Sequence, residues 1–201
     1  MKDLDSILQY VPTAAKSQIK DYLDVFKITV HVTAKRVTKH GDFRVYPDGS
    51  TRITINEMSN PYRFLITLVH ELAHFDTFKT YYRRVKPHGV EWKQKFQLLM
   101  LPLLNPSVFP EPLLSVLAHH LKNPKASSDS DLDLVMSLKK YDADSFKIYV
   151  FELDHGTLFS IYNGRQFLRG KKRVKRYECK EVKTGRIYLF SPYAEVTKIN
   201  S

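Results

Sequence analysis

The spacing of apolar residues changes along the 201-residue chain, and each change predicts a different kind of element. Near the start, apolar residues recur at helical spacing on either side of Pro12, which predicts two short amphipathic helices. From Lys27 to Glu57 the spacing becomes alternating and β-branched residues are frequent, as in residues 52–56. This stretch predicts a small, mostly antiparallel sheet. We expect its turns at His40-Gly41-Asp42 and Pro47-Asp48-Gly49.

A longer helix is predicted to follow the sheet. Asn60 suits a helix cap, and Pro61 suits the first helical position. The apolar residues that follow at helical spacing are Tyr62, Leu65, Ile66, Val69, Leu72 and Ala73. This stripe is expected to bury one side of the helix and to leave His70 and His74 directed off it.

The last third of the chain alternates again and predicts strands over 146–153, 157–162, 173–179 and 186–190. The segment 123–137, by contrast, is polar and serine-rich, which is typical of a linker. We therefore predict an α+β chain in three parts. These are a domain of helices and a small sheet (1–122), a polar acidic linker (123–137) and a small all-β domain of hairpins (138–201).

Composition adds a strong positive charge and almost no cysteine. The net charge of +11 divides into +6 over residues 1–122, −2 over 123–137 and +7 over 138–201, so an acidic or polyanionic partner is a reasonable expectation. The single cysteine, Cys179, rules out an internal disulfide and a cysteine-based zinc finger. The chain begins without a secretion-signal pattern, and no apolar run approaches the ~20 residues that span a bilayer. We expect a soluble cytoplasmic protein that does not bind membranes.

Residues 70–74 have the sequence His-Glu-Leu-Ala-His. On a helix, imidazoles at positions i and i+4 lie on one face and can hold one Zn²⁺ together. Glu71 lies one position around the helix, where a carboxylate can take a proton from the attacking water and pass it to the leaving amine. The spacing therefore predicts a zinc site with the chemistry of a metalloprotease.

Two histidines leave a catalytic zinc site one protein ligand short. The downstream candidates are His88, Glu91, His119 and His120. We favour His88 because Pro87 and Gly89 place it at a sharp bend before a helix, where packed scaffold would hold it.

Residues 70–74 followed by His88-Gly89-Val90-Glu91-Trp92 resemble the SprT-like metalloprotease family, whose pattern is HExxH, a variable loop and H-G-x-x-[WF]. The strand at 52–56 and the helix start at Asn60-Pro61 also resemble this family. The resemblance covers roughly residues 10–122. It implies a zincin-like fold, one Zn²⁺ held by His70, His74 and His88, and Glu71 as the catalytic residue. Eukaryotic relatives called Spartan cleave proteins crosslinked to DNA, so the resemblance implies protein substrates, DNA-associated ones among them.

The second domain departs from the family. Many bacterial SprT-like proteins end in a zinc ribbon with two cysteine pairs, of which Cys179 would be the one surviving position. We expect a ribbon-like β domain that has lost its metal, so that the chain binds one zinc ion. Aromatic residues would hold this domain together instead, namely Tyr149, Phe151, Phe159, Tyr177, Tyr188 and Phe190.

A basic run in the same domain predicts nucleic-acid binding through phosphate contacts. Its residues are Arg165, Arg169, Lys171, Lys172, Arg173, Lys175 and Arg176. The first functional hypothesis is thus a zinc metalloendopeptidase. The alternative is a DNA- or protein-binding module with a structural or idle zinc site. The number of protein ligands distinguishes them, since a structural site uses four and a catalytic site three.

Overall fold

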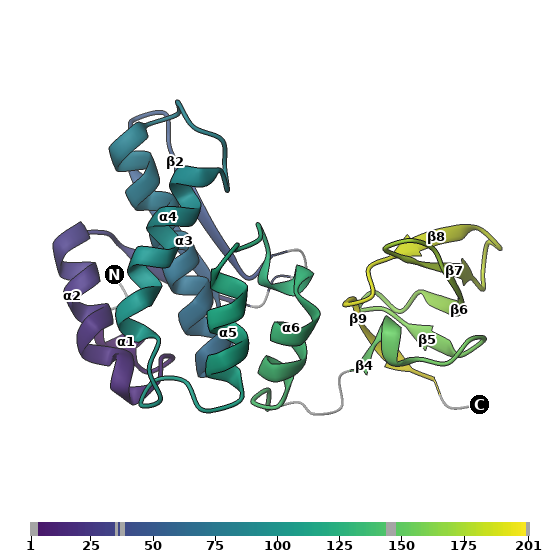
Figure 1. Ribbon diagram of the computed structural model, residues 1–201. Coiled ribbons are helices and arrows are strands. Elements are labelled where there is room, and N and C mark those ends of the chain that lie inside the picture. The colour runs from purple at the N-terminus through teal and green to yellow at the C-terminus, as the bar shows by residue number, and fades with distance from the viewer. Residues whose placement is uncertain (1–3, 35, 37–38, 144–147, 200–201) are drawn as a thin grey trace. The chain divides into compact units, whose positions relative to one another are not determined.

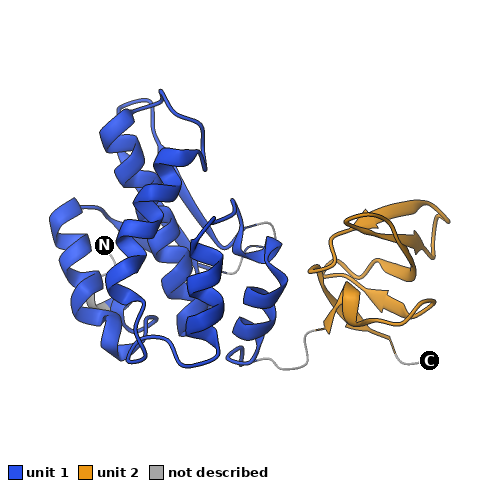
Figure 2. Ribbon diagram, viewed as in Figure 1, with its two compact units in different colours: residues 1–143 blue, residues 144–201 orange. Residues whose placement is uncertain are grey.

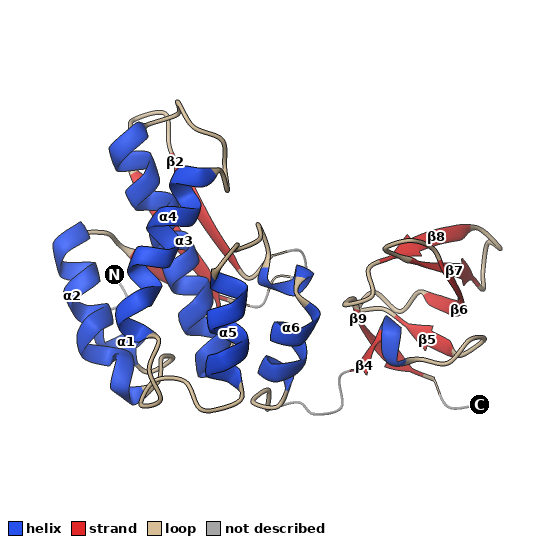
Figure 3. Cartoon of the chain, viewed as in Figure 1, coloured by secondary structure: helices blue, strands red, loops and turns tan. Residues whose placement is uncertain are grey.

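The chain forms two compact units, each with its own hydrophobic core (Figure 2). The computed structural model describes residues 4–34, 36, 39–143 and 148–199. The fold class is α+β as predicted: the described α-helices belong to the first unit, and the second is built mainly of strands (Figure 3). None of the described helices combines the length and the apolar character needed to cross a bilayer.

The boundary between the two units lies between residues 143 and 144. It does not lie within the segment 123–137, whose composition predicted a linker. Residues 132–139 of the first unit form helix α6 (Leu132–Lys139), and Leu134 and Leu138 are buried in its core. Asp131 caps this helix by accepting a hydrogen bond from the Leu134 N–H at 3.4 Å. The polar residues before α6 therefore serve as helix caps, which favour the same residue types as linkers do.

A three-stranded sheet in the first unit has the order β1-β3-β2, with β1 at Val30–Thr33, β2 at Gly41–Val45 and β3 at Thr51–Asn56 (Figure 1). Strand β1 runs parallel to β3 and β2 runs antiparallel to it, so the sheet is mixed rather than mostly antiparallel. The turn predicted at residues 47–49 joins β2 to β3, with Gly49 at φ 82°. The turn predicted at residues 40–42 is wrong, because Gly41 opens β2 opposite Ile55.

Helices precede and follow this sheet. The two short helices predicted first are α1 (Leu4–Leu8) and α2 (Lys16–Phe26). The long helix α3 (Pro61–Tyr81) begins as predicted, with the Asn60 side chain accepting hydrogen bonds from two backbone N–H groups at 3.1 and 3.0 Å. Unlike the predicted one-sided helix, α3 also buries Phe64 and Leu68, because it packs against both the sheet and α4 (Val90–Met100). Helix α5 (Leu113–Leu121) packs against α6.

The second unit is a six-stranded antiparallel sheet of order β4-β9-β5-β6-β7-β8. The strands are β4 (Ile148–Tyr149), β5 (Leu158–Ser160), β6 (Gln166–Lys172), β7 (Tyr177–Glu181), β8 (Ile187–Phe190) and β9 (Glu195–Lys198). Residues 146 and 147 of the first predicted strand lie outside the described residues. The strand predicted at 173–179 is wrong over 173–176, which connect β6 to β7, and β6 and β9 were not predicted.

Aromatic side chains form much of the core of this second unit, as predicted. Tyr149, Phe159 and Tyr177 are buried, and three others pack against the core while partly buried: Phe151, Tyr188 and Phe190. Phe167, which was not predicted, is buried among them and stacks on Phe159 with ring centres 5.7 Å apart.

Candidate metal centre

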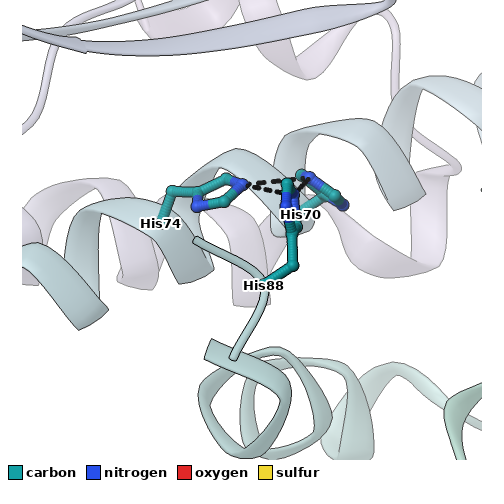
Figure 4. A group of neighbouring side chains, drawn as sticks. All are labelled: His70, His74 and His88. Atoms are coloured by element: carbon teal, nitrogen blue, oxygen red, sulfur yellow. Dashed lines mark hydrogen bonds between the residues drawn. The ribbon is translucent and has the colours of Figure 1, made fainter. Parts of the chain in front are cut away.

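Three imidazole rings converge at one point of the first unit. His70 and His74 project from α3 one turn apart, and His88 approaches from the connection between α3 and α4 (Figure 4). Their Nε2 atoms are separated by 2.9 Å (His74 to His88), 3.2 Å (His70 to His74) and 3.2 Å (His70 to His88). Within the described residues, this is the one group of three or more histidine, cysteine or acidic side chains close enough to share a metal ion.

The three short contacts cannot all be hydrogen bonds among neutral rings. A neutral imidazole nitrogen carries either a proton or a lone pair, and each hydrogen bond needs one nitrogen of each kind. Among three nitrogens at least two must be of the same kind, and the contact between those two is then repulsive. A cation among three unprotonated nitrogens removes this conflict, because each lone pair then faces positive charge. The arrangement therefore fits a metal site.

The surroundings keep these rings in the neutral form that binds metals. Burial, with a contribution from His88, lowers the pKa of His74 to about 3. Burial and the neighbouring imidazoles hold the pKa of His70 well below its ordinary value, and burial also lowers the pKa of His88. All three are thus ready to act as ligands at neutral pH without first losing a proton.

His88 is held in a tight bend of the chain. Its φ of 57° lies in the left-handed region, which a residue other than glycine rarely adopts. The next residue, Gly89, caps α4, and a β-carbon there would lie 2.9 Å from the Lys86 carbonyl oxygen. Backbone strain of this kind, of roughly 1–3 kcal/mol, persists where surrounding structure enforces it, as at binding sites.

Trp92 lies against all three histidines. Its ring centre is 4.6 Å from that of His70, 5.3 Å from that of His74 and 4.7 Å from that of His88. The ring is fully buried and its N–H donates to the His70 carbonyl at 3.4 Å. Trp92 entered the sequence-based prediction only as part of the motif at residues 88–92, and this contact was not predicted. Its position one turn after His88, on the helix that His88 precedes, is the signal that could have revealed it.

Glu71 lies beside the histidines and is only 6% exposed. Burial, assisted by the nearby charge of Asp42, raises the pKa of its carboxyl group to about 8. The Phe43 N–H and the charge of Arg36 act in the opposite direction. The chain thus places a buried carboxyl group that can hold or release a proton near neutral pH at the position that follows His70 on α3.

The structure does not bring the other proposed third ligands to His70 and His74. Glu91 lies in the first turn of α4, and His119 is exposed near the end of α5. His120 is buried and pairs with Asp131 at 2.8 Å. Of the four candidates, only His88 joins the pair.

The structure does not test the predicted nucleic-acid-binding run, although several of its residues have partners within the second unit. Its four arginines contact their own sheet: Arg165, Arg169, Arg173 and Arg176. Their partners are, in the same order, Glu181, the ring of Tyr177, Glu178 and the carbonyl of Leu189. The lysines Lys171, Lys172 and Lys175 are exposed. Phosphate contacts from these lysines stay a prediction.

Comparisons of the chain with known protein families, with curated proteins and with solved structures give no match. The resemblance to SprT-like proteases therefore rests on the sequence motifs at residues 70–74 and 88–92, with the strand at 52–56 and the helix start at Asn60-Pro61.

Proposed function

We propose that the chain is a zinc metallopeptidase with a zincin-like catalytic unit, in which His70, His74 and His88 hold one Zn²⁺ and Glu71 is the catalytic base. The convergence of three Nε2 atoms beside a buried glutamate carries this proposal. Tetrahedral zinc with bonds of ~2.0–2.1 Å to nitrogen needs ligand atoms ~3.3 Å apart, and the observed separations of 2.9–3.2 Å are close to this.

The number of ligands favours an enzyme over a structural site. Within the described residues, three protein side chains share the site, and no fourth histidine, cysteine or acidic residue joins them. Structural zinc sites are closed by four protein ligands, whereas catalytic sites use three and leave one position for water or substrate.

The residues around the site can perform the proton transfers of peptide hydrolysis. Zinc bound there would supply a Lewis acid for the attacking water and the scissile carbonyl. Positive charge nearby favours the ionised form of Glu71, whose pKa burial otherwise raises to about 8. A group that titrates near neutral pH is well suited to take a proton from water and return it to the leaving amine. The Phe43 N–H donates to this carboxylate and helps to orient it.

Protein substrates, including DNA-associated or DNA-crosslinked proteins, are the substrate class that the resemblance to SprT-like proteases implies. The charge of the second unit is compatible with this, since residues 144–201 contain 12 Lys and Arg against 6 Asp and Glu. The exposed lysines at 171, 172 and 175 are the residues that would meet phosphates.

The proposal is tested with the full chain loaded with one equivalent of Zn²⁺. An unfolded protein and a DNA-crosslinked protein serve as substrates for the native chain, Glu71→Gln and Glu91→Gln. We expect Glu71→Gln to keep its zinc and to lose hydrolysis by about 10²–10⁴-fold, the usual contribution of a general acid–base group. The matched control Glu91→Gln removes a charge from the first turn of α4 and should stay active.

Two results would count against the proposal. Full activity of Glu71→Gln, or activity that survives complete removal of zinc, would exclude the mechanism. A chain that binds one zinc ion tightly but hydrolyses neither substrate would instead favour a binding module with a structural or idle zinc site.

A further inference from the structure

Strand β8 lies at one end of the six-stranded sheet and has a neighbouring strand, β7, on one side only. The strand at the opposite end, β4, is two residues long, whereas β8 covers the four residues Ile187–Phe190. The open side of an edge strand presents backbone groups that another extended chain can pair with. The second unit therefore offers its more extensive edge at β8.

The register identifies the backbone groups that face outward. The Glu181 N–H donates to the Arg186 carbonyl at 2.8 Å, next to the Cα pair of Lys180 and Ile187. In an antiparallel ladder this makes Ile187 a residue of a non-hydrogen-bonded pair, and Leu189, two residues on, is another. The N–H and C=O groups of Ile187 and Leu189 are thus directed away from β7. Of these four groups, the Leu189 carbonyl already accepts a hydrogen bond from the Arg176 side chain at 3.5 Å.

The same two residues also expose apolar side chains. Ile187 is 64% exposed and Leu189 is 53% exposed. The register continues from Ile187 through Lys180 to Leu168, which is 40% exposed. These side chains form a row on the outer face of the sheet in which one lysine lies between two apolar residues. Single exposed apolar residues are common, but a row beside an open strand edge indicates a binding surface.

The charge at this edge is positive. The acidic residues of β7 are paired, Glu178 with Arg173 and Glu181 with Arg165. Lys180 and Lys183 are exposed and have no ion pair within the part of the chain that the structure describes. A partner with acidic side chains would therefore be attracted to this edge.

We propose that β8 binds an extended segment of a partner protein, with alternating apolar and acidic residues, as an added strand. Backbone hydrogen bonds to both groups of Ile187 and to the Leu189 N–H would align the segment, and the side chains of Ile187 and Leu189 would contact its apolar residues. A nucleic acid fits this edge less well, because bases stack on aromatic rings and the exposed row contains none. The aromatic residues of β8, Tyr188 and Phe190, pack against the core of the unit instead. The proposal does not depend on the metal site.

The probe is a short, fluorescently labelled synthetic peptide of alternating glutamate and valine, and binding to the full chain is followed by anisotropy. A control peptide carries proline in place of every valine, which keeps the charge but removes strand-pairing N–H groups. Leu189→Pro removes an outward N–H while leaving the ladder to β7 intact. We expect this variant and the control peptide each to weaken binding by at least about tenfold.

A second pair of variants separates apolar contact from charge. Ile187→Lys adds a positive charge at the edge, and Val174→Lys adds the same charge at a residue that is 93% exposed in the β6–β7 connection. We expect Ile187→Lys to bind the acidic probe at least about tenfold more weakly and Val174→Lys to bind it as the native chain does. This pair decides the matter even if Leu189→Pro disturbs the fold of the second unit.

Several outcomes would overturn the proposal. If Ile187→Lys binds the probe more tightly than the native chain does, charge alone explains the binding. The same conclusion follows if the proline peptide binds as tightly as the probe does. If single-stranded DNA displaces the probe from the native chain and fails to bind to Ile187→Lys, this pair of results would assign the edge to nucleic acid. If the native chain dimerises in a concentration-dependent way and Ile187→Lys does not, the edge at β8 binds a second copy of the chain.

Discussion

The backbone of Gly41 lies directly against the carboxyl group of Glu71. A β-carbon at residue 41 would lie 2.6 Å from Oε1 of Glu71 and 2.8 Å from its Cγ. Gly41 begins β2 and Glu71 lies on α3, so the edge of the sheet and the helix of the histidines meet here without an intervening side chain. The contact contributes to the burial that raises the pKa of Glu71 to about 8.

Replacing Gly41 by alanine should therefore damage the proposed catalytic group more than the metal site. The added methyl group would collide with Glu71 and with Cγ2 of Thr67, 2.8 Å away, and such overpacking costs about 1–3 kcal/mol of stability. We expect Gly41→Ala to bind zinc but to hydrolyse protein poorly. Urea unfolding, zinc titration and a peptidase assay measure the three effects.

Gly49→Ala is the matched control for this prediction. Gly49 has φ +82°, and a β-carbon there would have no atom of the described residues within 4 Å beyond its immediate chain neighbours. Alanine at this position therefore meets only backbone strain of roughly 1–2 kcal/mol. Hydrolysis should survive that change. Equal loss of hydrolysis in both variants would show that the effect comes from general destabilisation.

Trp92 should report metal binding through its fluorescence. It is the only tryptophan of the chain, and its ring centre lies 4.6–5.3 Å from those of the three histidines. An open-shell ion such as Co²⁺ bound by these rings would quench the indole emission at such close range. We expect Co²⁺ to quench emission with a stoichiometry of one ion per chain, and Zn²⁺ in excess to restore it.

The control for this prediction uses two histidine variants. His88→Ala removes one of the converging nitrogens and should abolish quenching at low Co²⁺ concentrations. His155→Ala removes an exposed histidine of the second unit and should leave the titration unchanged. Quenching that persists in His88→Ala would place the ion elsewhere.

Local rules account for the parts of the site that the sequence could predict. The Asn60 cap, the start at Pro61 and the one-turn spacing of His70 and His74 all depend on neighbours within one helix. The bend at His88 is signalled by the adjacent Pro87 and Gly89. Such features are determined by residues a few positions apart, so a single sequence is enough to find them.

The parts that were missed depend on pairing between distant segments. The contact between Gly41 and Glu71 requires β2 to pair antiparallel with β3 at the edge of the sheet, whereas a glycine between polar residues predicts a turn. Residues 123–137 were misassigned for a similar reason. Their serines and aspartates are typical of linkers. The burial of Leu134 and the ion pairs of Asp129 with His40 and Arg63 join them to the first unit.

Asp131 should make the first unit sensitive to acid. Burial opposes ionisation of this carboxyl group, but the hydrogen bonds from His120 and from the Leu134 N–H outweigh it and lower its pKa. A lowered pKa means that Asp131 stabilises the fold above its unfolded value of ~3.9 and that this contribution disappears as the pH falls through the folded value. Asp131→Asn, which can still cap α6, should lose about 1–3 kcal/mol at pH ~6.

The difference between the native chain and Asp131→Asn should shrink when urea unfolding is repeated at successively lower pH below the unfolded pKa of ~3.9. A constant difference over this range would contradict the lowered pKa of Asp131. Asp133→Asn removes an exposed charge from the same turn of α6 and should change stability by at most about 0.5 kcal/mol.

Cys179 should be inert while the second unit is folded. The residue is fully buried, and burial raises the pKa of its thiol to about 11 against the opposing effects of the Gly170 backbone and Arg169. The thiolate is the form that reacts with iodoacetamide, so at neutral pH ionisation alone slows the reaction on the order of 10²-fold relative to an unfolded cysteine of pKa ~8.5. Burial slows it further, and alkylation should therefore follow the opening of the second unit in urea. Rapid alkylation without denaturant would mean that the Cys179 thiol is accessible in the folded unit, contrary to its burial.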